Sequence, residues 1–416
     1  MQPEAEDQVR DSVDHLFRHQ AGQMVSVLSR IFGVEKIDAI EDAVQDALVA
    51  ALRKWPYGGI PENRSAWLIQ TAKNRLIDGL RRDGKSEVVD DDILDAARSD
   101  DIRFAGELNE DQLRMIFACC HPAIPPDSQV ALTLKIVGGF SVGEITSAYL
   151  SNDEAVAKML TRAKSKLRTG DVDLAIPVGD DLKKRLDAVL RVLYLMFNEG
   201  YAASAGDELI RKDLCFEAIR LAQIVANHPV TSLPKVHSLT ALFLFQSARL
   251  STRSDNQGEL LLLAEQDRLL WDKEMLAIGL EYFRRSASGT EISEYHIEAE
   301  IASLHALAPD FGSTDWRRIL ECYDILLSER FSPVVALNRS VVVGQIGGAE
   351  AALAELSKLA GHYMMTSFNL FHITRAKFLA QLGCLDEAKD AYLKAEVLTR
   401  NESVARFIQK RIAELG

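Results

Sequence analysis

The sequence lacks long apolar runs, a signal-like start and a paired set of cysteines. The chain has 416 residues, and it contains no uninterrupted run of the roughly eighteen apolar residues that a membrane-spanning helix needs. Residues 1–7 are acidic, whereas a signal peptide begins with a basic segment and an apolar one. The five cysteines are an odd number and indicate a reducing compartment. We therefore expect a cytoplasmic protein with no membrane association.

Motifs of enzyme and metal sites are also scarce. No Gly-rich phosphate loop or nucleophile elbow is present. The segment 91–95 (DDILD) matches a pattern that binds Mg²⁺ in prenyl-diphosphate enzymes, but it lies among further acidic residues and has no second acidic motif on a later helix. The Cys119-Cys120-His121 run has adjacent cysteines, which rarely close a tetrahedral metal site. We interpret the first as an acidic linker and the second as partly buried thiols, and we expect no metal, cofactor or catalysis.

Positive charge is local in a chain that is acidic as a whole. The formal net charge is −13, whereas proteins that bind bulk DNA are usually basic. Two segments, 67–82 and 156–168, nevertheless repeat apolar residues every three or four positions and place cations on the opposite face. Such helices can pack on a core and turn a positive stripe toward phosphates. The combination of an acidic chain with two local basic segments predicts that the chain alone binds DNA weakly and that a larger partner strengthens this binding.

The second basic segment has the spacing of a helix-turn-helix. Ser141 is a suitable N-cap for a first helix over 141–149, a turn follows near 150–151, and a longer helix begins near Asn152 or Asp153. The second helix of this motif enters the major groove of DNA. Its cations could hold phosphates or reach guanine edges: Lys158, Arg162, Lys164, Lys166 and Arg168. A helical hairpin with a solvated cationic face is the alternative for this segment taken alone.

The first block combines aromatic, basic and acidic faces. The loop over 55–63 contains two prolines and two adjacent glycines, and it carries Trp55 and Tyr57 ahead of a basic helix that opens with Trp67. Aromatic side chains beside cations can stack with unpaired bases, although buried Trp and Tyr are commoner. The preceding helix, 38–52, has an acidic face that would repel DNA. We interpret that face as a protein-binding surface.

The C-terminal region contains a faint repeat. Residues 339–353 align without a gap on 375–389, at an offset of 36 residues, with Arg, Gln, Gly and Ala recurring. A helix, a Gly-containing turn and a second helix at such a period is the tetratricopeptide pattern. Units of this kind stack into a curved array with a concave binding surface. An irregular helical bundle is the alternative.

Several of these segments resemble one protein family. Residues 38–47 and 66–78 are similar to region 2 of bacterial extracytoplasmic-function sigma factors, and residues 144–145 and 160–164 to their region 4. Four further segments resemble the subgroup with a C-terminal tetratricopeptide-like extension, namely 113–122, 197–201, 266–268 and 332–339. The resemblance spans nearly the whole chain, with the motifs in the family's order.

The resemblance implies an all-α fold built from sigma regions and a helical extension. The implied divisions are 1–82 (region 2), 83–106 (acidic linker), 107–169 (region 4), 170–181 (linker) and 182–416 (tetratricopeptide-like regulatory domain). It also implies the function, which is to bind core RNA polymerase and direct promoter recognition and transcription initiation. The implied partners are promoter DNA and the β′ clamp helices and β flap of the polymerase.

Roles follow position by position from the same resemblance. Core docking is expected of Glu41, Asp42, Gln45 and Asp46. Binding of the −10 element is expected of Trp55, Tyr57, Asn63, Trp67, Lys73, Asn74, Arg81 and Arg82, with a flipped base captured by the loop. The five cations of the second basic segment are expected to bind the −35 element. Two positions depart from the family's pattern: Leu150 stands where the turn usually has Gly, and Met159 replaces an Arg, which removes one expected DNA contact.

Two other readings of the sequence remain open. A transcriptional regulator with a helix-turn-helix and a tetratricopeptide-like sensor, acting without polymerase, would account for residues 107–416 but leave the first block without a role. A scaffold with purely structural basic helices would make the two-site arrangement accidental. The extension itself is expected to bind either the sigma domains of its own chain or another protein.

Overall fold

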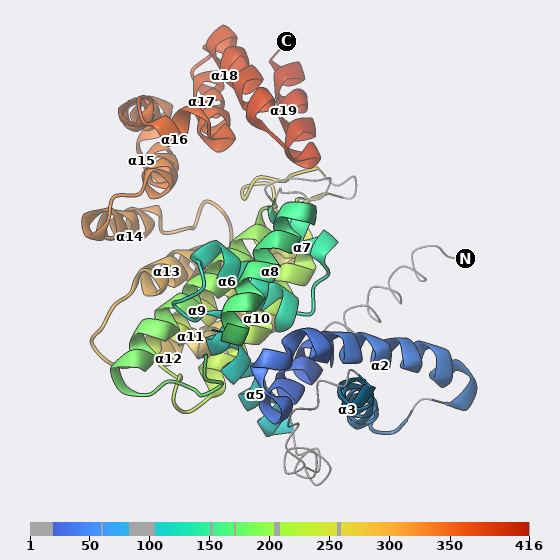
Figure 1. Cartoon of the computed structure of the whole chain (residues 1–416). Helices are drawn as coiled ribbons and strands as arrows, with labels where there is room; N and C mark the ends of the chain where they lie inside the picture. The colour runs from blue at the N-terminus through green and yellow to red at the C-terminus, as the bar shows by residue number, and fades with distance from the viewer. Residues whose placement is uncertain are drawn as a thin grey trace. The chain divides into compact units, whose positions relative to one another are not determined.

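The structure is a computed structural model, and it describes residues 20–59, 61–82, 105–149, 153–169, 172–203, 209–255 and 259–415. Within these ranges the fold is helical and contains no strand, and Ser254 and Leu260 form an isolated antiparallel bridge. The predicted all-α class is confirmed (Figure 1). The chain divides into two compact units, Met1–Met196 and Phe197–Gly416.

Unit 1 begins with four helical segments before the longest gap in its described residues. A helix over residues 20–32 and the short 3₁₀ helix η1 (Val34–Lys36) precede α2 (Ile37–Gly58) and α3 (Arg64–Arg82), which lie side by side in Figure 1. Helical spacing on α2 buries Ile40, Val44, Ala47 and Ala51 on one face and leaves Asp42 and Asp46 exposed on another. Gly59 ends α2 with φ 81°, a backbone conformation that favours glycine.

The remaining helices of unit 1 are α5 (Ala105–Cys119), α6 (Pro126–Ile136), α7 (Val142–Tyr149), α8 (Asp153–Thr169) and most of α9 (Gly179–Tyr201). Ser141 caps α7 as expected: its N–H donates to the Glu144 carboxylate (2.7 Å), and the Glu144 N–H donates to the Ser141 hydroxyl (3.2 Å). The expected helix-turn-helix pair is therefore present as α7 and α8, whereas the turn itself, with Leu150, lies outside the described residues.

The two halves of unit 1 pack closely against each other. A Cβ added to Gly22, in the first helix, would collide with the backbone carbonyl of Val137, just after α6, so only glycine permits this approach. Nearby, the Arg30 guanidinium donates to the buried Asp111 carboxylate of α5 (3.0 Å). Burial raises the pKa of Asp111, and Arg30 lowers it in part. The segments predicted as regions 2 and 4 thus form one compact unit in this structure.

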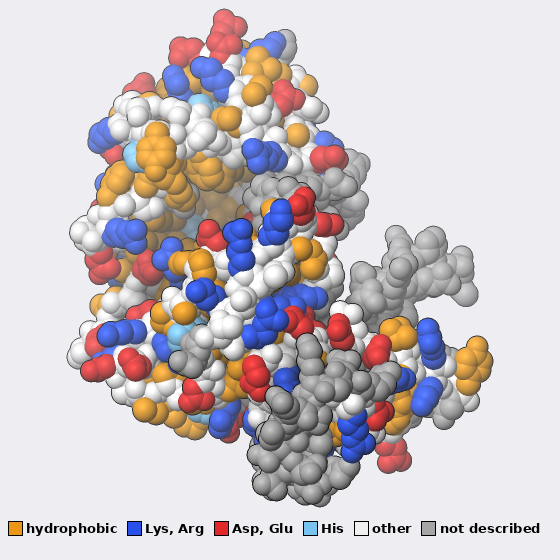
Figure 2. All heavy atoms as spheres, in the orientation of Figure 1, with side chains coloured by type: hydrophobic (Ala, Val, Ile, Leu, Met, Phe, Trp, Pro, Cys, Tyr) orange, Lys and Arg blue, Asp and Glu red, His pale blue; other side chains and the backbone are white. Residues whose placement is uncertain are grey.

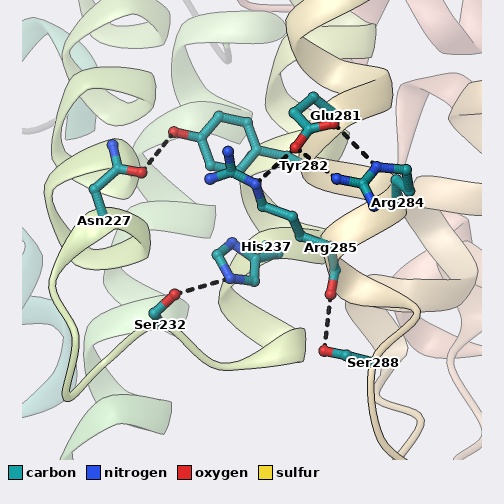
Figure 3. A network of polar contacts seen from close by, with 8 residues as sticks. All are labelled: Asn227, Ser232, His237, Glu281, Tyr282, Arg284, Arg285 and Ser288. Carbon is teal, nitrogen blue, oxygen red and sulfur yellow. Dashed lines mark hydrogen bonds and ion pairs between the residues drawn. The ribbon is translucent and has the colours of Figure 1, made fainter.

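Unit 2 begins with a layer of long helices. These are α10 (Lys212–Asn227), α11 (Pro234–Ser247), α12 (Lys273–Ser286) and α13 (Glu294–Leu307). Polar contacts connect them, as Figure 3 shows: the Tyr282 hydroxyl of α12 donates to the side-chain carbonyl of Asn227 (3.2 Å), and Ser232 bonds to His237 (3.0 Å). Burial lowers the pKa of His237, and Arg285 lowers it further, so the ring is neutral at neutral pH.

The chain ends with α14 (Trp316–Glu329), α15 (Pro333–Leu359), α16 (Tyr363–Thr366), α17 (Asn369–Gln381), α18 (Leu385–Leu398) and α19 (Glu402–Glu414). Both copies of the faint repeat fold as a helix, a glycine turn and a second helix, because α15 is kinked at Gly348 (φ 85°) and α17 is followed by Gly383 (φ 77°). The ungapped alignment pairs Gly383 with Gly347, so the two turns differ by one position. The repeat therefore predicts local structure correctly at both places.

Candidate nucleic-acid and polymerase interface

One face of α3 presents polar and basic side chains to solvent. Asn74 and Arg81, both predicted −10 contacts, are exposed, and so is Arg75 between them. The Asn74 side-chain carbonyl accepts a hydrogen bond from Gln70 (3.0 Å), one helical turn earlier, which orients its amide. Lys73 differs from the prediction: it is only 3% exposed and faces the protein, so it cannot reach a phosphate in this structure. The Arg82 side chain lies outside the described residues.

An open recess of about 510 Å³ lies between the end of α2 and the start of α3. It is lined by Gln20, Trp55, Glu62, Asn63, Arg64, Ser65 and Leu68. Trp67 supports one wall, since its ring meets the Trp55 ring edge to face at 5.6 Å. The side-chain carbonyl of Asn63 accepts the backbone N–H of Ala66 (3.0 Å) and so caps α3. Two predicted residues, Trp55 and Asn63, therefore line one concave site.

Tyr57 is the most exposed aromatic of this segment. It lies in the last turn of α2, beside the recess residue Trp55 in sequence, and its side chain is 94% exposed. A large apolar ring gains nothing for the fold from such exposure. Tyr57 is not among the residues that line the recess, but its exposed ring is available to stack on an unpaired base.

The predicted docking face of α2 is mostly accessible. Asp42, Gln45 and Asp46 are exposed along one side of the helix. Glu41 was expected to be exposed, but it is only 9% exposed, because α6 and α8 cover it through Lys135 and Lys164. Three of the four predicted docking residues are thus free to meet a protein surface.

The cations of α8 divide into an exposed group and an engaged group. Arg162, Lys166 and Lys158 are exposed, and Lys158 pairs with Glu154 one turn earlier (2.6 Å). Lys164 and Arg168 instead contact α2. In Figure 2, Lys and Arg side chains border Asp and Glu side chains where α8 approaches the start of α2. The five predicted −35 residues are therefore not equally available in this arrangement.

The engaged group forms an ionic cluster between α8 and α2. The Lys164 ammonium contacts the Glu41 carboxylate and lies 3.2 Å from Asp38, and Arg168 lies 2.8 Å from Asp38. Lys135 of α6 adds a third cation 3.8 Å from Glu41. Burial lowers the pKa of Lys164, but Glu41 and Asp38 outweigh it, so the pKa is raised and the ammonium stays charged. We call Asp38, Glu41, Lys135, Lys164 and Arg168 the ionic latch.

The sequence analysis did not identify two members of the latch, Asp38 and Lys135. Asp38 lies three residues before the predicted residue Glu41 and therefore shares its face of α2, which was a usable signal. Lys135 had no such signal, because its partner is distant in sequence. Long-range pairing of this kind can only be seen once the two halves of the unit are folded together.

The cysteine pair is structural in the described protein. Cys119 and Cys120, expected to be partly buried, are completely buried at the end of α5. Burial raises the pKa of the Cys120 thiol to about 12, which keeps it protonated. Among the described residues no group of three or more His, Cys, Asp or Glu is arranged to hold a metal ion. The 91–95 segment lies outside those residues.

Comparison with known proteins defines the class. Residues 16–86, which contain α2, α3 and the recess, match sigma-70 region 2, and residues 185–287 match a family of unknown function (DUF6596). The chain therefore contains a sigma-70 region 2 domain followed by a helical C-terminal part, and this domain supports a sigma-factor-like role in transcription initiation, with core RNA polymerase and promoter DNA as the implied partners. None of the described helices is both long enough and apolar enough to cross a membrane.

The chain also has a relative along nearly its whole length. This chain is 36% identical over 400 residues to "Uncharacterized protein R00370" of Rhizobium meliloti (strain 1021), an alignment that covers 95% of this chain and 93% of that protein. The two proteins therefore belong to one family. No solved structure matches the chain.

Proposed function

We propose that this protein is a sigma factor of the extracytoplasmic-function type, which binds core RNA polymerase and directs it to promoters without catalysing a reaction itself. The observation that carries the proposal is the recess beside Trp55, within the segment that matches sigma-70 region 2. The recess is lined by the aromatic ring of Trp55, the amide of Asn63 and the cation of Arg64, which suits an extruded base and its backbone. Exposed Asn74 and Arg81 lie further along α3.

Promoter opening would use the recess and the α3 face together. A base that leaves the stack at the −10 element would enter the recess, where the free amide group of Asn63 can meet its pairing edge. Asn74, Arg81 and the Arg82 position would hold the adjoining strand. Lys73 has no part in this proposal, because it is buried.

Binding of the −35 element would use α8 as the recognition helix of the α7–α8 pair. Exposed Lys158, Arg162 and Lys166 are available for phosphates or base edges. Lys164 and Arg168 would first have to leave the ionic latch. We infer that the chain alone is held in a closed state, and that polymerase and promoter together open it.

The C-terminal helices would set the balance between these states. Helix–turn–helix units with glycine turns at Gly348 and Gly383 support a tetratricopeptide-like array. We propose that this domain regulates transcription, either by binding the sigma domains of its own chain or by binding another protein. A truncated chain, residues 1–203, keeps α9 complete and should differ from the full chain in transcription. Equal activity of the two would make the extension an independent binding module.

Run-off transcription tests the main proposal. Purified protein is combined with core polymerase from its own organism and a library of genomic promoter fragments. Promoter-dependent transcripts that require the protein are expected. If no fragment gives such transcripts while the protein binds duplex DNA alone, the chain is instead a regulator that acts without polymerase through α7 and α8.

A further inference from the structure

Two sequence segments of unit 2 that the proposed function leaves unused, 197–201 and 266–268, contribute to one cluster of arginines. Tyr201 ends α9, and the guanidinium carbons of Arg253 and Arg249 lie 3.9 Å and 5.5 Å from the centre of its ring. Arg249 also donates to the Tyr201 hydroxyl, and Arg253 to its backbone carbonyl. Two guanidinium groups therefore stand against a single aromatic ring.

A third arginine comes from the other segment. Arg268 opens the short helix η3 (Arg268–Leu270), and its guanidinium lies 5.0 Å from the Trp271 ring. The next residue, Asp272, donates its backbone N–H to Ala248 (2.8 Å), which holds this segment against the end of α11 beside Arg249. The charge of Arg249 adds to the burial that lowers the pKa of Arg253 and Arg268. Arg249, Arg253 and Arg268 thus form one group, which we call the arginine cluster.

In the described part of unit 2 the cluster has no ionic partner in direct contact, although the charge of Asp310 partly offsets the lowering of the Arg268 pKa. Among the described residues, no carboxylate lies within 4.0 Å of any of the three guanidinium groups. By contrast, Arg284 and Arg285 on the neighbouring α12 both bind Glu281 at 3.0 Å (Figure 3). Half-buried cations gathered without an anion are unfavourable unless they serve a ligand. Nothing else in the described fold of unit 2 requires three positive charges at this place.

The bonds that the cluster does make go to neutral oxygens. Arg268 donates to the backbone carbonyls of His305 (2.6 Å) and Ala308 (2.7 Å) at the end of α13, and Arg249 donates to Gln246 (3.1 Å). Each guanidinium has five N–H donors, so several remain on every side chain. The three arginines are partly accessible rather than sealed in the core. A small solute can therefore reach donors that the protein itself does not use.

Buried polar atoms near the cluster also have spare hydrogen-bonding capacity. Trp271 is 3% exposed and Gln266 8% exposed, and among the described residues neither the indole N–H nor the Gln266 side-chain carbonyl has a partner. The same holds for Nδ1 of His305, whose backbone carbonyl binds Arg268. Buried polar groups are normally satisfied. The unpaired indole N–H of Trp271, beside three cations that have no carboxylate within 4.0 Å, is an independent indication of a ligand site.

We propose that the arginine cluster binds a small oxyanion, a metabolite that carries a phosphate or a carboxylate group. Guanidinium groups match the geometry of both anions, because two parallel N–H donors can face two oxygens. The indole N–H of Trp271 supplies a further donor. Because the cluster joins the end of α9, α11, η3 and the end of α13, the bound anion stabilises unit 2 and gives the extension a chemical signal to respond to. This proposal does not depend on the function in transcription.

Calorimetric titration of the full chain, in zwitterionic buffer, tests the site with three probes: inorganic phosphate, pyrophosphate and succinate. Sodium chloride at matched ionic strength controls for charge screening. Saturable binding at one site and a raised melting temperature are expected with at least one probe. Arg249→Met should weaken binding about tenfold or more, since it removes a charged hydrogen-bond donor. Arg284→Met, which removes an exposed arginine that already has an anion, should leave binding unchanged.

A measurement on the unaltered protein guards against misfolded variants. Phenylglyoxal modifies arginine, and mass spectrometry locates the products; the bound anion should slow modification of the three cluster arginines but not of Arg284. Binding of the two phosphates alone identifies a phosphorylated ligand, and binding of succinate alone a carboxylate. The proposal is overturned by the absence of saturable binding to all three probes, by binding that persists in Arg249→Met, or by equal modification rates with and without the probes.

Discussion

Arg168 of the proposed recognition helix lies 2.8 Å from Asp38 of α2, the helix whose next turns carry the proposed polymerase-docking face. Lys164, one turn earlier on α8, contacts Glu41 of that same docking set. In the proposed function, promoter DNA and the acidic helix would compete for these two cations. Polymerase docking and −35 binding would then be coupled, because separation of α2 from α8 exposes surfaces that both proposed events use.

Removal of the acidic half of the ionic latch should strengthen DNA binding by the free protein. In Asp38→Asn/Glu41→Gln, Lys164 and Arg168 lose their competing partners, and the latch pairs are together worth on the order of 1–2 kcal/mol. We expect about a tenfold higher affinity for a −35 duplex, measured by fluorescence anisotropy without polymerase. Glu154→Gln is the matched control, since it frees only the exposed Lys158. Equal affinities in the double variant and the control would show that the latch does not limit DNA binding.

The exposed acidic face of α2 should determine polymerase docking. Asp42→Lys/Asp46→Lys reverses two charges one helical turn apart and is expected to abolish co-purification with core polymerase while the fold persists, because both side chains are exposed. The control is Asp386→Lys/Asp390→Lys on α18, which has the same spacing and exposure in unit 2. Retained binding by the α2 variant would locate the docking surface elsewhere.

Tyr57→Ala should impair promoter melting without affecting stability. The side chain is 94% exposed, so its loss should change the free energy of unfolding by less than about 0.5 kcal/mol. One lost base-stacking contact is worth about 1–3 kcal/mol, and open-complex formation should fall about ten- to a hundredfold. Permanganate footprinting measures the melted strand. Tyr363→Ala, which removes another exposed tyrosine, should melt the promoter normally.

The sequence predicts helices well here because their signals are local. The apolar spacing of α2, the Ser141 cap and the glycine turns at Gly348 and Gly383 each depend on neighbours within a few residues. The acidic face, the aromatics Trp55 and Tyr57 and the α8 cations were found for the same reason, although the loop expected over 55–63 is wrong for 55–58, because α2 continues to Gly58. Lys73 shows the limit: its helical phase places it beside Asn74, but packing within the unit covers it.

What the sequence could not supply depends on distant pairs. The latch joins Asp38 to Arg168, and the arginine cluster joins Tyr201 to Arg249 and Arg253. Such partners meet only through tertiary packing, and no pattern along the chain specifies them. The segments 197–201 and 266–268 were identified in the sequence by their resemblance to a family. That both contribute to the arginine cluster is visible only in the folded unit 2.

His305 should make the stability of unit 2 depend on pH in the mildly acidic range. Burial, together with the charges of Arg249 and Arg268, lowers its pKa from 6.5 to about 4. Between pH 6.5 and 4 the unfolded chain therefore binds a proton that the folded protein does not, so stability is greatest above pH 6.5 and is lost as the pH falls. The loss attributable to this ring is on the order of 2–3 kcal/mol.

His305→Phe keeps a ring against Trp316, which the histidine meets edge to face at 5.3 Å, and removes the titration. Urea unfolding at a series of pH values, in zwitterionic buffers, should show a smaller loss for the variant and similar stability at pH 7.5; an unchanged pH profile would mean that His305 does not titrate in this range.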